Sequence, residues 1–363
     1  MSKAAYLILE NGRIFEGKFF GAQREAMGEI VFSTGMTGYL ETLTDNSYYG
    51  QIVLQTFPLI GNYGIIPSDF ENRSAKTNGY IVKSWCEEPS NFRSEGNLDT
   101  FLKDQDIPGI YGIDTREITK IIRDTGVMNA KITDNINNID FNEIKNYKIT
   151  NAIQNVSCKE IAQFAGTGCV RPHDYKVVLV DYGVKESIKQ KLSDKGCDVW
   201  TVPYNTPAEE IKNINPGGIV LSDGPGDPNA AENSEIINNI KEIINLNIPV
   251  FGICLGHQLL ALANGFKTNK LKFGHRGLNQ PVKNLFTGKV YITSQNHGYE
   301  VLRESIDENI AKISFENVND KTCEGIEYIN RPVYSVQFHP DDCPSPHGTG
   351  FLYEKFIEKM GGI

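Results

Sequence analysis

The pattern of hydrophobic and polar positions changes near residue 176, and the second part of the chain is the more regular one. Short apolar runs there predict strands, and the amphipathic segments between them predict helices. The predicted strands are 177–180, 198–202, 218–222 and 248–253, and the predicted helices are 185–195, from 206 onward, 233–246 and from 255 onward. Strands that alternate with helices favour an α/β fold, with a doubly wound, mostly parallel sheet and helices on both faces.

The first part of the chain has a β-rich start that is broken by glycine-rich turns. Strands are predicted at 6–10, 12–20, 28–33 and 51–57, and a turn at 61–64. One helix is well marked, because Asp114 and Glu117 have capping-box spacing, isoleucines follow at helical intervals, and Gly126 ends it. The polar stretch 42–49 is interpreted as a solvated loop. The pattern indicates a β-rich α+β domain.

These two patterns predict two domains. Periodicity weakens between residues 151 and 175, around Gly166, Gly168 and Pro172, and we place a linker there. The expected domains are therefore an N-terminal one at 1–150 and a C-terminal one at 176–363. A chain of 363 residues is long enough for each domain to bury a core of its own.

Composition and charge argue against several classes of function. The formal net charge of -9 gives no basic surface for nucleic acid or an anionic membrane, so small molecules and proteins are the expected partners. The only apolar run near the N-terminus is short and stops at Glu10, which fits neither a signal peptide nor a membrane span. We therefore expect a cytoplasmic protein. The 7 cysteines include no C-x-x-C pair, so neither a disulfide framework nor a zinc finger is expected.

One cysteine is placed for chemistry. Gly252 and Gly256 bracket Cys254 between the strand 248–253 and the helix that follows, in the form of a nucleophile elbow. Such a turn lifts a side chain clear of the sheet, and the helix N-terminus favours a reactive thiolate. The alternative is a buried cysteine in an ordinary strand-to-helix joint, since free cysteines often act as small hydrophobes.

A thiolate nucleophile needs a base, and His339 is the best candidate. It ends a predicted strand that begins at Tyr334, and in extended backbone Asp341 would point the same way and orient its ring. For His339 taken alone, a satisfied histidine at the end of a strand is the better interpretation, but pairing with a cysteine in an elbow weakens that alternative. The Leu255 N–H and the turn from Gly224 to Gly226 are candidate donors for an oxyanion. Further polar groups near these segments are Gln258 and the stretch 294–299.

Two absences limit the chemistry. The chain has neither a G-x-x-x-x-G-K-[ST] phosphate loop nor a G-x-G-x-x-G motif after a strand, so nucleotide chemistry must come from another chain. Cys254, His257, His275 and His297 match no familiar pattern of metal ligands. We expect neither a metal nor a cofactor in this chain.

Four motifs of the second part together resemble the class I, triad-type glutamine amidotransferases, whose domain is flavodoxin-like. They are Phe251-Gly-Ile-Cys-Leu-Gly-His-Gln258, Asp223-Gly-Pro-Gly-Asp-Pro228, Ser294-Gln-Asn-His-Gly298 and Gln337-Phe-His-Pro340. The first part resembles the N-terminal domain of carbamoyl-phosphate synthase small subunits. Its marks are Ser33-Thr-Gly-Met-Thr-Gly-Tyr39, Leu43-Thr-Asp-Asn-Ser-Tyr48, Gly61-Asn-Tyr-Gly64 and Ile113-Asp-Thr-Arg116. The resemblance thus covers the whole chain.

The resemblance implies the glutamine-hydrolysing subunit of a heterodimeric, ATP-dependent carbamoyl-phosphate synthase. Cys254 would attack the side-chain amide of L-glutamine, His339 would protonate the departing ammonia, and water would cleave the thioester. The implied glutamine contacts are Ser47, Gly224, Gly226, Leu255, Gln258, Asn296, Gly298 and Tyr299. A separate large subunit would receive the ammonia through a tunnel and use ATP, with its magnesium, and bicarbonate, to serve arginine or pyrimidine synthesis.

The chain departs from the family at the third triad position. Asp341 stands where the family has glutamate, and it is shorter by one methylene, about 1.5 Å of reach. Two alternatives stay open. One is the glutaminase subunit of another amidotransferase, such as one feeding anthranilate or GMP synthesis, against which the first domain speaks. The other is a regulatory subunit whose triad has decayed, against which the retention of Cys254 and His339 speaks.

Overall fold

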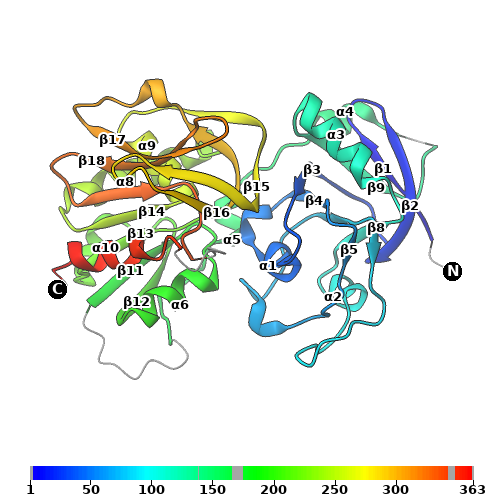
Figure 1. The fold of residues 1–363 in the computed structure, drawn as a ribbon, viewed down its shortest axis with the longest axis horizontal. Coiled ribbons are helices and arrows are strands. Elements are labelled where there is room, and N and C mark those ends of the chain that lie inside the picture. The colour runs from blue at the N-terminus through cyan, green and yellow to red at the C-terminus, as the bar shows by residue number, and fades with distance from the viewer. Residues whose placement is uncertain (1–2, 138, 166–174, 342–347, 362–363) are drawn as a thin grey trace. The chain divides into compact units, whose positions relative to one another are not determined.

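The structure is a computed structural model that describes residues 3–137, 139–165, 175–341 and 348–361. The chain forms two compact units, Met1–Ala152 and Ile153–Ile363 (Figure 1). The helix α5 (Ala152–Val156) and the short strand β10 (Ala162–Gln163) fall within the stretch that the sequence predicts as a linker, whose residues 166–174 lie outside the described part. None of the helices in the described ranges has the length and apolar character needed to cross a membrane.

The first unit is built on a closed barrel of mixed strands, in agreement with the β-rich expectation. Around the barrel the strands are β1 (Ala4–Leu9), β2 (Ile14–Gly21), β8 (Pro108–Tyr111), β6 (Gly79–Ile81), β4 (Gln51–Gln55), β3 (Ala26–Ser33) and β9 (Met128–Thr133). The strands β5 (Leu59–Ile60) and β7 (Ser84–Trp85) form a separate pair. The helices are α1 (Tyr39–Thr44), α2 (Leu98–Asp104), α3 (Thr115–Thr125) and α4 (Phe141–Asn146), with short 3-10 turns η1 (Asn46–Tyr48) and η2 (Pro67–Asp69).

The helix α3 confirms the capping prediction. The Asp114 carboxylate accepts a hydrogen bond from the Glu117 N–H at 2.9 Å, and Gly126 ends the helix with φ at 102°. Ile118 and Ile122 are buried on its inner face. The Glu117 side chain forms an ion pair with Arg13. The local sequence therefore fixes both ends of this helix.

The prediction of a solvated loop at 42–49 is wrong. Leu43 and Tyr48 pack in a core of the first unit, and the polar residues Thr44, Asp45 and Asn46 are buried between them. The Asn46 side-chain oxygen has no hydrogen-bond partner among the described residues, whereas Thr44 and Asp45 are satisfied locally: Thr44 donates to the Leu40 carbonyl at 2.7 Å, and Asp45 accepts from the Ser47 N–H at 2.8 Å. Polar composition misled because short local hydrogen bonds satisfy these groups without water.

The second unit has one large mixed sheet, and the expectation of a mostly parallel sheet is corrected to a half-parallel one. In spatial order the strands are β10, β12 (Cys197–Pro203), β11 (Tyr175–Asp181), β13 (Gly218–Leu221), β14 (Val250–Ile253), β19 (Val333–Val336), β18 (Cys323–Tyr328), β16 (Val290–Val301), β15 (Thr268–Asn284) and β17 (Ala311–Asn317). Parallel pairing runs from β12 to β19, and all other pairs are antiparallel. Between β15 and β19 no α-helix intervenes to make parallel crossovers, so these strands pair through hairpins.

Helices cover both faces of the parallel half, as expected. They are α6 (Glu186–Asp194), α7 (Ala208–Asn213), α8 (Ser234–Asn245), α9 (Leu255–Ala263) and α10 (Phe351–Lys359), with 3-10 turns η3 (Ala231–Asn233) and η4 (Arg303–Ser305). Along β11, Val178 and Val180 enter a core with α7, α8 and α9, while Val177 and Leu179 enter a core with α6 and α10. The sheet thereby presents the carboxyl ends of β11, β13, β14 and β19 on one edge, where ligands of such folds bind.

Candidate functional site

Cys254 lies at the turn between β14 and α9, and its backbone is strained. Its φ of 50° and ψ of -103° fall in a region that side-chain-bearing residues rarely adopt. Such a conformation costs about 1–3 kcal/mol and persists only where the surrounding fold imposes it. The strain is the one expected of a nucleophile elbow, and it favours this interpretation over an ordinary strand-to-helix joint.

The two glycines around Cys254 are required by close packing. A Cβ on Gly256 would stand 2.2 Å from the Leu221 carbonyl oxygen, and one on Gly252 would stand 3.0 Å from the Gly256 carbonyl oxygen. The Gly256 N–H also donates to the Ser222 carbonyl at 2.9 Å. These contacts seat the start of α9 tightly against β13, which forces the sharp turn at Cys254.

Two polar groups with opposite effects lie close to the Cys254 thiol. It lies 3.7 Å from the backbone oxygen of Asn296, which can accept the S–H, and 3.6 Å from Nε2 of Gln337, which can donate to the sulfur. Only the second contact is retained when the thiol becomes a thiolate, since a carbonyl oxygen repels the anion. An amide donor aimed at sulfur therefore favours the reactive form.

Gln258 connects this sulfur contact to the strand β16. Its Nε2 donates to the Tyr299 carbonyl at 2.8 Å and to Oε1 of Gln337 at 2.9 Å. Gln337 is fully buried, and its backbone N–H donates to the Glu324 carbonyl at 2.9 Å. The two amides form a chain that ends on the Cys254 sulfur, so the Gln337 side chain is held with its N–H groups toward the nucleophile.

His339 lies just beyond β19, the parallel neighbour of β14. Its N–H donates to the Ser294 carbonyl at 3.0 Å, in an isolated bridge between the two residues. The Cys254 N–H donates to the Val336 carbonyl at 2.9 Å. The pairing thus brings the segments of both predicted reactive residues to the same edge of the sheet, with His339 fully buried.

Asp341 contacts a residue that the sequence did not single out. Its Oδ2 accepts a hydrogen bond from the Ser187 hydroxyl, near the start of α6, at 2.8 Å. The backbone bends at Asp341, whereas the prediction that it orients His339 assumed a continuous extended strand. Its assignment as the third member of a triad stays a prediction.

The predicted oxyanion donors lie at two backbone segments near the thiol. The Leu255 N–H belongs to the first residue of α9 and has no hydrogen-bond partner within 175–341 or the other described ranges. At Gly224 a Cβ would stand 2.2 Å from the Tyr182 carbonyl oxygen, and Gly226 has φ at 96°. Both positions therefore require glycine, and a bare backbone there can approach a ligand closely.

Ser47 belongs to the first unit, where it lies in η1 and is buried. Its hydroxyl makes no hydrogen bond to any residue that the structure describes. A buried hydroxyl without a partner is uncommon and is consistent with a ligand contact. Gly298, the remaining implied contact, lies in β16 beside Arg276, whose Nη2 would stand 3.1 Å from an added Cβ.

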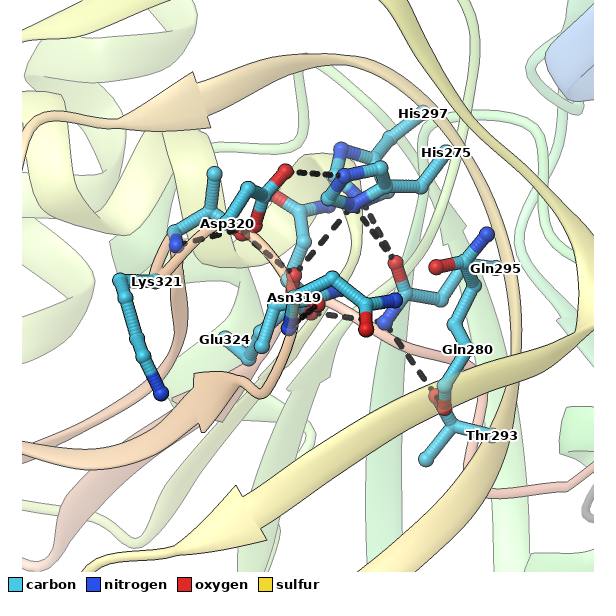
Figure 2. Close-up of polar contacts among 12 residues, drawn as sticks. His275, Gln280, Thr293, Gln295, His297, Asn319, Asp320, Lys321 and Glu324 are labelled. Atoms are coloured by element: carbon cyan, nitrogen blue, oxygen red, sulfur yellow. Dashed lines mark hydrogen bonds and ion pairs between the residues drawn. The ribbon is translucent and has the colours of Figure 1, made fainter.

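A polar cluster lies between β15, β16 and β18, and its members are buried except for the exposed Asp320 (Figure 2). His275 Nε2 is 2.8 Å from Oδ2 of Asp320, and its Nδ1 is 3.0 Å from Oε1 of Gln295 and 3.5 Å from Oε1 of Glu324. His297 Nε2 is 3.0 Å from the same Gln295 oxygen, and its Nδ1 is 2.8 Å from the Tyr299 carbonyl.

Burial and charge set the protonation of this cluster. Burial lowers the pKa of His275, but hydrogen bonds and charges from Asp320 and Glu324 outweigh it and raise that pKa to about 9. Burial lowers the pKa of His297 well below its ordinary value, and the charges of His275, Arg276 and His339 lower it further. His275 is therefore an imidazolium near neutral pH, and His297 is neutral.

The ligand atoms of His275, His297 and Glu324 lie within 4.8 Å of one another, so their spacing fits a metal ion. The chemistry fits less well. His275 faces a carboxyl group at each ring nitrogen, Asp320 at Nε2 and Glu324 at Nδ1, and holds two protons, whereas a metal requires a lone pair on a neutral imidazole. We interpret the cluster as an ion-pair network, with the imidazolium as its cation.

Sequence reasoning missed three contributors: Gln337, Ser187 and the His275 cluster. Gln337 stood two residues before His339 in a quoted motif, and alternation along an extended strand would have pointed both side chains the same way. Ser187 and Asp341 are far apart in sequence, so no local signal links them. The cluster draws its residues from three strands and a turn, and only the fold brings these together.

Comparison with known proteins supplies the family. Residues 7–132 match the family described as carbamoyl-phosphate synthase small chain, CPSase domain, and residues 178–359 match glutamine amidotransferase class-I. A carbamoyl phosphate synthase small chain of Fusobacterium nucleatum subsp. nucleatum is 50% identical over 98% of this chain and 97% of its own length. Those of Streptococcus agalactiae and Bacillus cereus are 49% and 48% identical, over 98% and 97% of this chain and 97% and 94% of theirs. With identity of this degree over nearly its whole length, the chain belongs to the carbamoyl phosphate synthase small chain family.

Proposed function

We propose that this chain is the glutamine-hydrolysing subunit of a carbamoyl phosphate synthase. The observation that carries the proposal is Cys254, held in strained backbone at the carboxyl edge of the sheet with an amide donor on its sulfur. Membership of the family supports the assignment, since its members carry this amidotransferase domain. The two parts of the chain are then the small-chain N-terminal domain, 1–150, and the amidotransferase domain, 176–363, joined at 151–175.

The reaction begins with attack of the Cys254 thiolate on the side-chain carbonyl carbon of L-glutamine. The oxyanion that forms is stabilised by the backbone N–H groups of Leu255 and Gly224. His339 donates a proton to the departing nitrogen, so the C–N bond breaks and ammonia leaves a γ-glutamyl thioester. His339 then takes a proton from water, which attacks the thioester and releases glutamate and the free thiol. Asp341 orients the imidazole through these steps.

The substrate lies against backbone and amide groups, which suits a neutral side-chain amide. Gln258, Asn296, Gly298 and Tyr299 line this position from α9 and β16, and Gly224 and Gly226 line it from the turn after β13. The Gln258 contact to the Tyr299 carbonyl supports this arrangement, because it fixes the spacing of α9 and β16 at the predicted site.

Ammonia is consumed by a separate large subunit, which binds ATP and magnesium and takes bicarbonate as its second substrate. This division of labour is consistent with the absence of a phosphate loop from this chain. Direct transfer is chemically sensible, because ammonia released to water at neutral pH is mostly ammonium, which is not a nucleophile. The two subunits together form the complete ligase.

Glutamate release from L-glutamine tests the proposal. We would assay wild-type chain and Cys254→Ser, each alone and with a carbamoyl phosphate synthase large chain, ATP and bicarbonate. The substitution should lower the rate by roughly a thousandfold or more, and the large chain should raise the wild-type rate. Cys197→Ser is the matched control, since Cys197 is a buried cysteine on β12 of the same unit. Hydrolysis that survives Cys254→Ser, or that is absent from every mixture, contradicts the assignment.

A further inference from the structure

The strand β16 contacts the predicted site through its backbone and the charged cluster through its side chains. Its backbone touches both predicted reactive residues, since the Asn296 carbonyl lies 3.7 Å from the Cys254 sulfur and the Ser294 carbonyl accepts the His339 N–H at 3.0 Å. The side chains of Gln295 and His297, which alternate with these positions, point into the charged cluster instead (Figure 2). Whatever holds those two side chains also holds the backbone of the predicted site.

Backbone pairing alone restrains this part of β16 poorly. Its ladder with β15 runs in three segments, and the middle one, where His275, Arg276 and Gly277 face residues 297, 296 and 295, is only three residues long and has a register shift on each side. Bulges of this kind interrupt the hydrogen-bonded ladder and re-aim side chains. A second restraint is therefore needed at the place where the strand meets Cys254.

The cluster supplies such a restraint through Gln295. Its Nε2 donates to Oε2 of Glu324 at 2.9 Å and to the Thr293 hydroxyl at 3.2 Å, and its Oε1 accepts from His275. Glu324 is fully buried on β18, so the amide is tied to a strand on the opposite side from β15. Both ends of the Gln295 side chain are thus fixed.

His275 is itself held by Asp320 from the turn between β17 and β18. Burial opposes ionisation of this carboxyl, but the hydrogen bond and charge of His275 and hydrogen bonds from Thr322 lower its pKa to about 2. Thr322 donates its N–H to Asp320 at 3.2 Å and places its hydroxyl 3.0 Å from Oε1 of Glu324. The imidazolium therefore lies between Asp320 and Glu324, both of which contact Thr322. The neutral His297 ring packs edge-on against it.

We propose that His275, Asp320 and Glu324 are positioning residues for glutamine, which act through Gln295 by holding β16 in the register that the site needs. This inference rests on the proposed glutaminase function. The cluster contacts neither the Cys254 sulfur nor the His339 N–H, so it governs how well glutamine binds more than how fast the thiolate attacks. Loss of the charge on His275 loosens the strand, and KM for L-glutamine rises.

The closing experiment compares Asp320→Asn with wild type in glutamine hydrolysis as a function of pH. In wild type, KM should rise as pH passes the His275 pKa of about 9. The charged groups that face His275 are Asp320 and Glu324, with Glu300 farther off and the neutral His297 ring beside it. Removing the Asp320 carboxylate lowers the pKa of His275, so the rise moves to lower pH. Near neutral pH we expect KM to increase roughly tenfold, with a smaller change in kcat.

Glu316→Gln is the matched control. Glu316 lies on β17 of the same sheet and pairs with Arg303 at 2.9 Å and Lys321 at 3.5 Å, without contact to His275. Its KM profile should follow wild type. Alkylation of Cys254 by iodoacetamide should proceed at the wild-type rate in Glu316→Gln, since nothing that holds β16 is changed there. His275→Gln keeps the idea testable if Asp320→Asn misfolds, because it removes the titrating imidazole while the α-ammonium group of glutamine still titrates as it does with wild type.

Several outcomes would overturn the inference. They are a flat KM across the titration of His275 in wild type, an Asp320→Asn profile that matches Glu316→Gln, or one equivalent of tightly bound metal that disappears in His275→Gln. The last result would replace the ion pair by a metal centre. If wild type itself hydrolyses no glutamine, the proposed function fails. If wild type hydrolyses glutamine but its KM does not change with the charge on His275, only the positioning role fails.

Discussion

At the scale of single residues, the contact between Gln337 and the Cys254 sulfur makes a direct prediction. Gln337→Leu keeps the size of the side chain but removes the donor, and a hydrogen bond to a charged group contributes about 1.5–3 kcal/mol. Alkylation of Cys254 by iodoacetamide near neutral pH should slow by about tenfold or more, and its midpoint should move to higher pH. Gln163→Leu, at an exposed amide that bonds Asp198, is the control. Equal alkylation profiles for the two variants would remove Gln337 from the site.

Asp341 tests whether an aspartate serves as the third member of the triad. If it orients His339, Asp341→Asn should lower kcat by roughly a hundredfold to ten-thousandfold with little change in KM, because only the ring's orientation and charge are disturbed. Asp194→Asn, at the exposed end of α6, is the matched control. Steady-state kinetics on both variants decide the matter. An unchanged kcat would leave Asp341 a structural partner of Ser187.

The contrast between Cys254 and Gln337 shows what sequence resolves at this scale. Cys254 was predictable because its turn needs glycines at fixed offsets, and those glycines are visible in the chain. Gln337 lay inside a recognised motif but received no role, since its meaning depends on where the sulfur of another strand lies. The bend at Asp341 was equally hidden, because it breaks the extended backbone that the prediction assumed.

At the scale of elements, the elbow between β14 and α9 depends on Gly256. Gly256→Ala would force a methyl group against the Leu221 carbonyl at 2.2 Å, and overpacking of this kind typically costs about 1–3 kcal/mol. Urea unfolding should give a lower free energy of unfolding, and alkylation of Cys254 should become slower as the turn relaxes. Gly350→Ala is the control, because a Cβ there meets open space and its φ is -55°. A Gly256→Ala protein as stable as Gly350→Ala would show that the turn is not tightly packed.

Elements with local signals were the predictable ones. The helix α3 was marked by its cap, its isoleucine spacing and its final glycine, all within one short stretch. The antiparallel half of the sheet had no such marks: β15 carries two register shifts that break the alternation of apolar and polar positions, and its place is fixed by pairing with β16 and β17. A strand that relies on partners distant in sequence gives little periodicity to read.

At the scale of the whole molecule, buried histidines shape how stability depends on pH. Burial lowers the pKa of His257 to about 3 and that of His297 well below 6.5, so the unfolded chain binds more protons than the folded one in acid. Their contribution is present above pH 6.5 and is lost as pH falls toward 3. The pKa of His275 is raised to about 9, so its contribution is complete below 6.5 and is lost as pH rises through 9. Together they place a stability maximum near pH 6.5.

Urea unfolding of the full chain at a series of pH values measures this maximum. Each proton difference between the unfolded and folded states gives a slope of about 1.4 kcal/mol per pH unit. Burial raises the pKa of Cys197 and Cys323 to about 12, so these thiols lower the free energy of unfolding only above their ordinary pKa of 9.0. Between pH 6.5 and 9 the decline in the free energy of unfolding is therefore assigned to His275. His275→Gln should flatten the alkaline limb and leave the acid limb, whereas His257→Gln should make the acid limb less steep, with the His297 part remaining, and leave the alkaline limb. An alkaline limb that persists unchanged in His275→Gln would show that the imidazolium does not stabilise the fold. It would also contradict the proposed positioning of β16, which depends on the same charge.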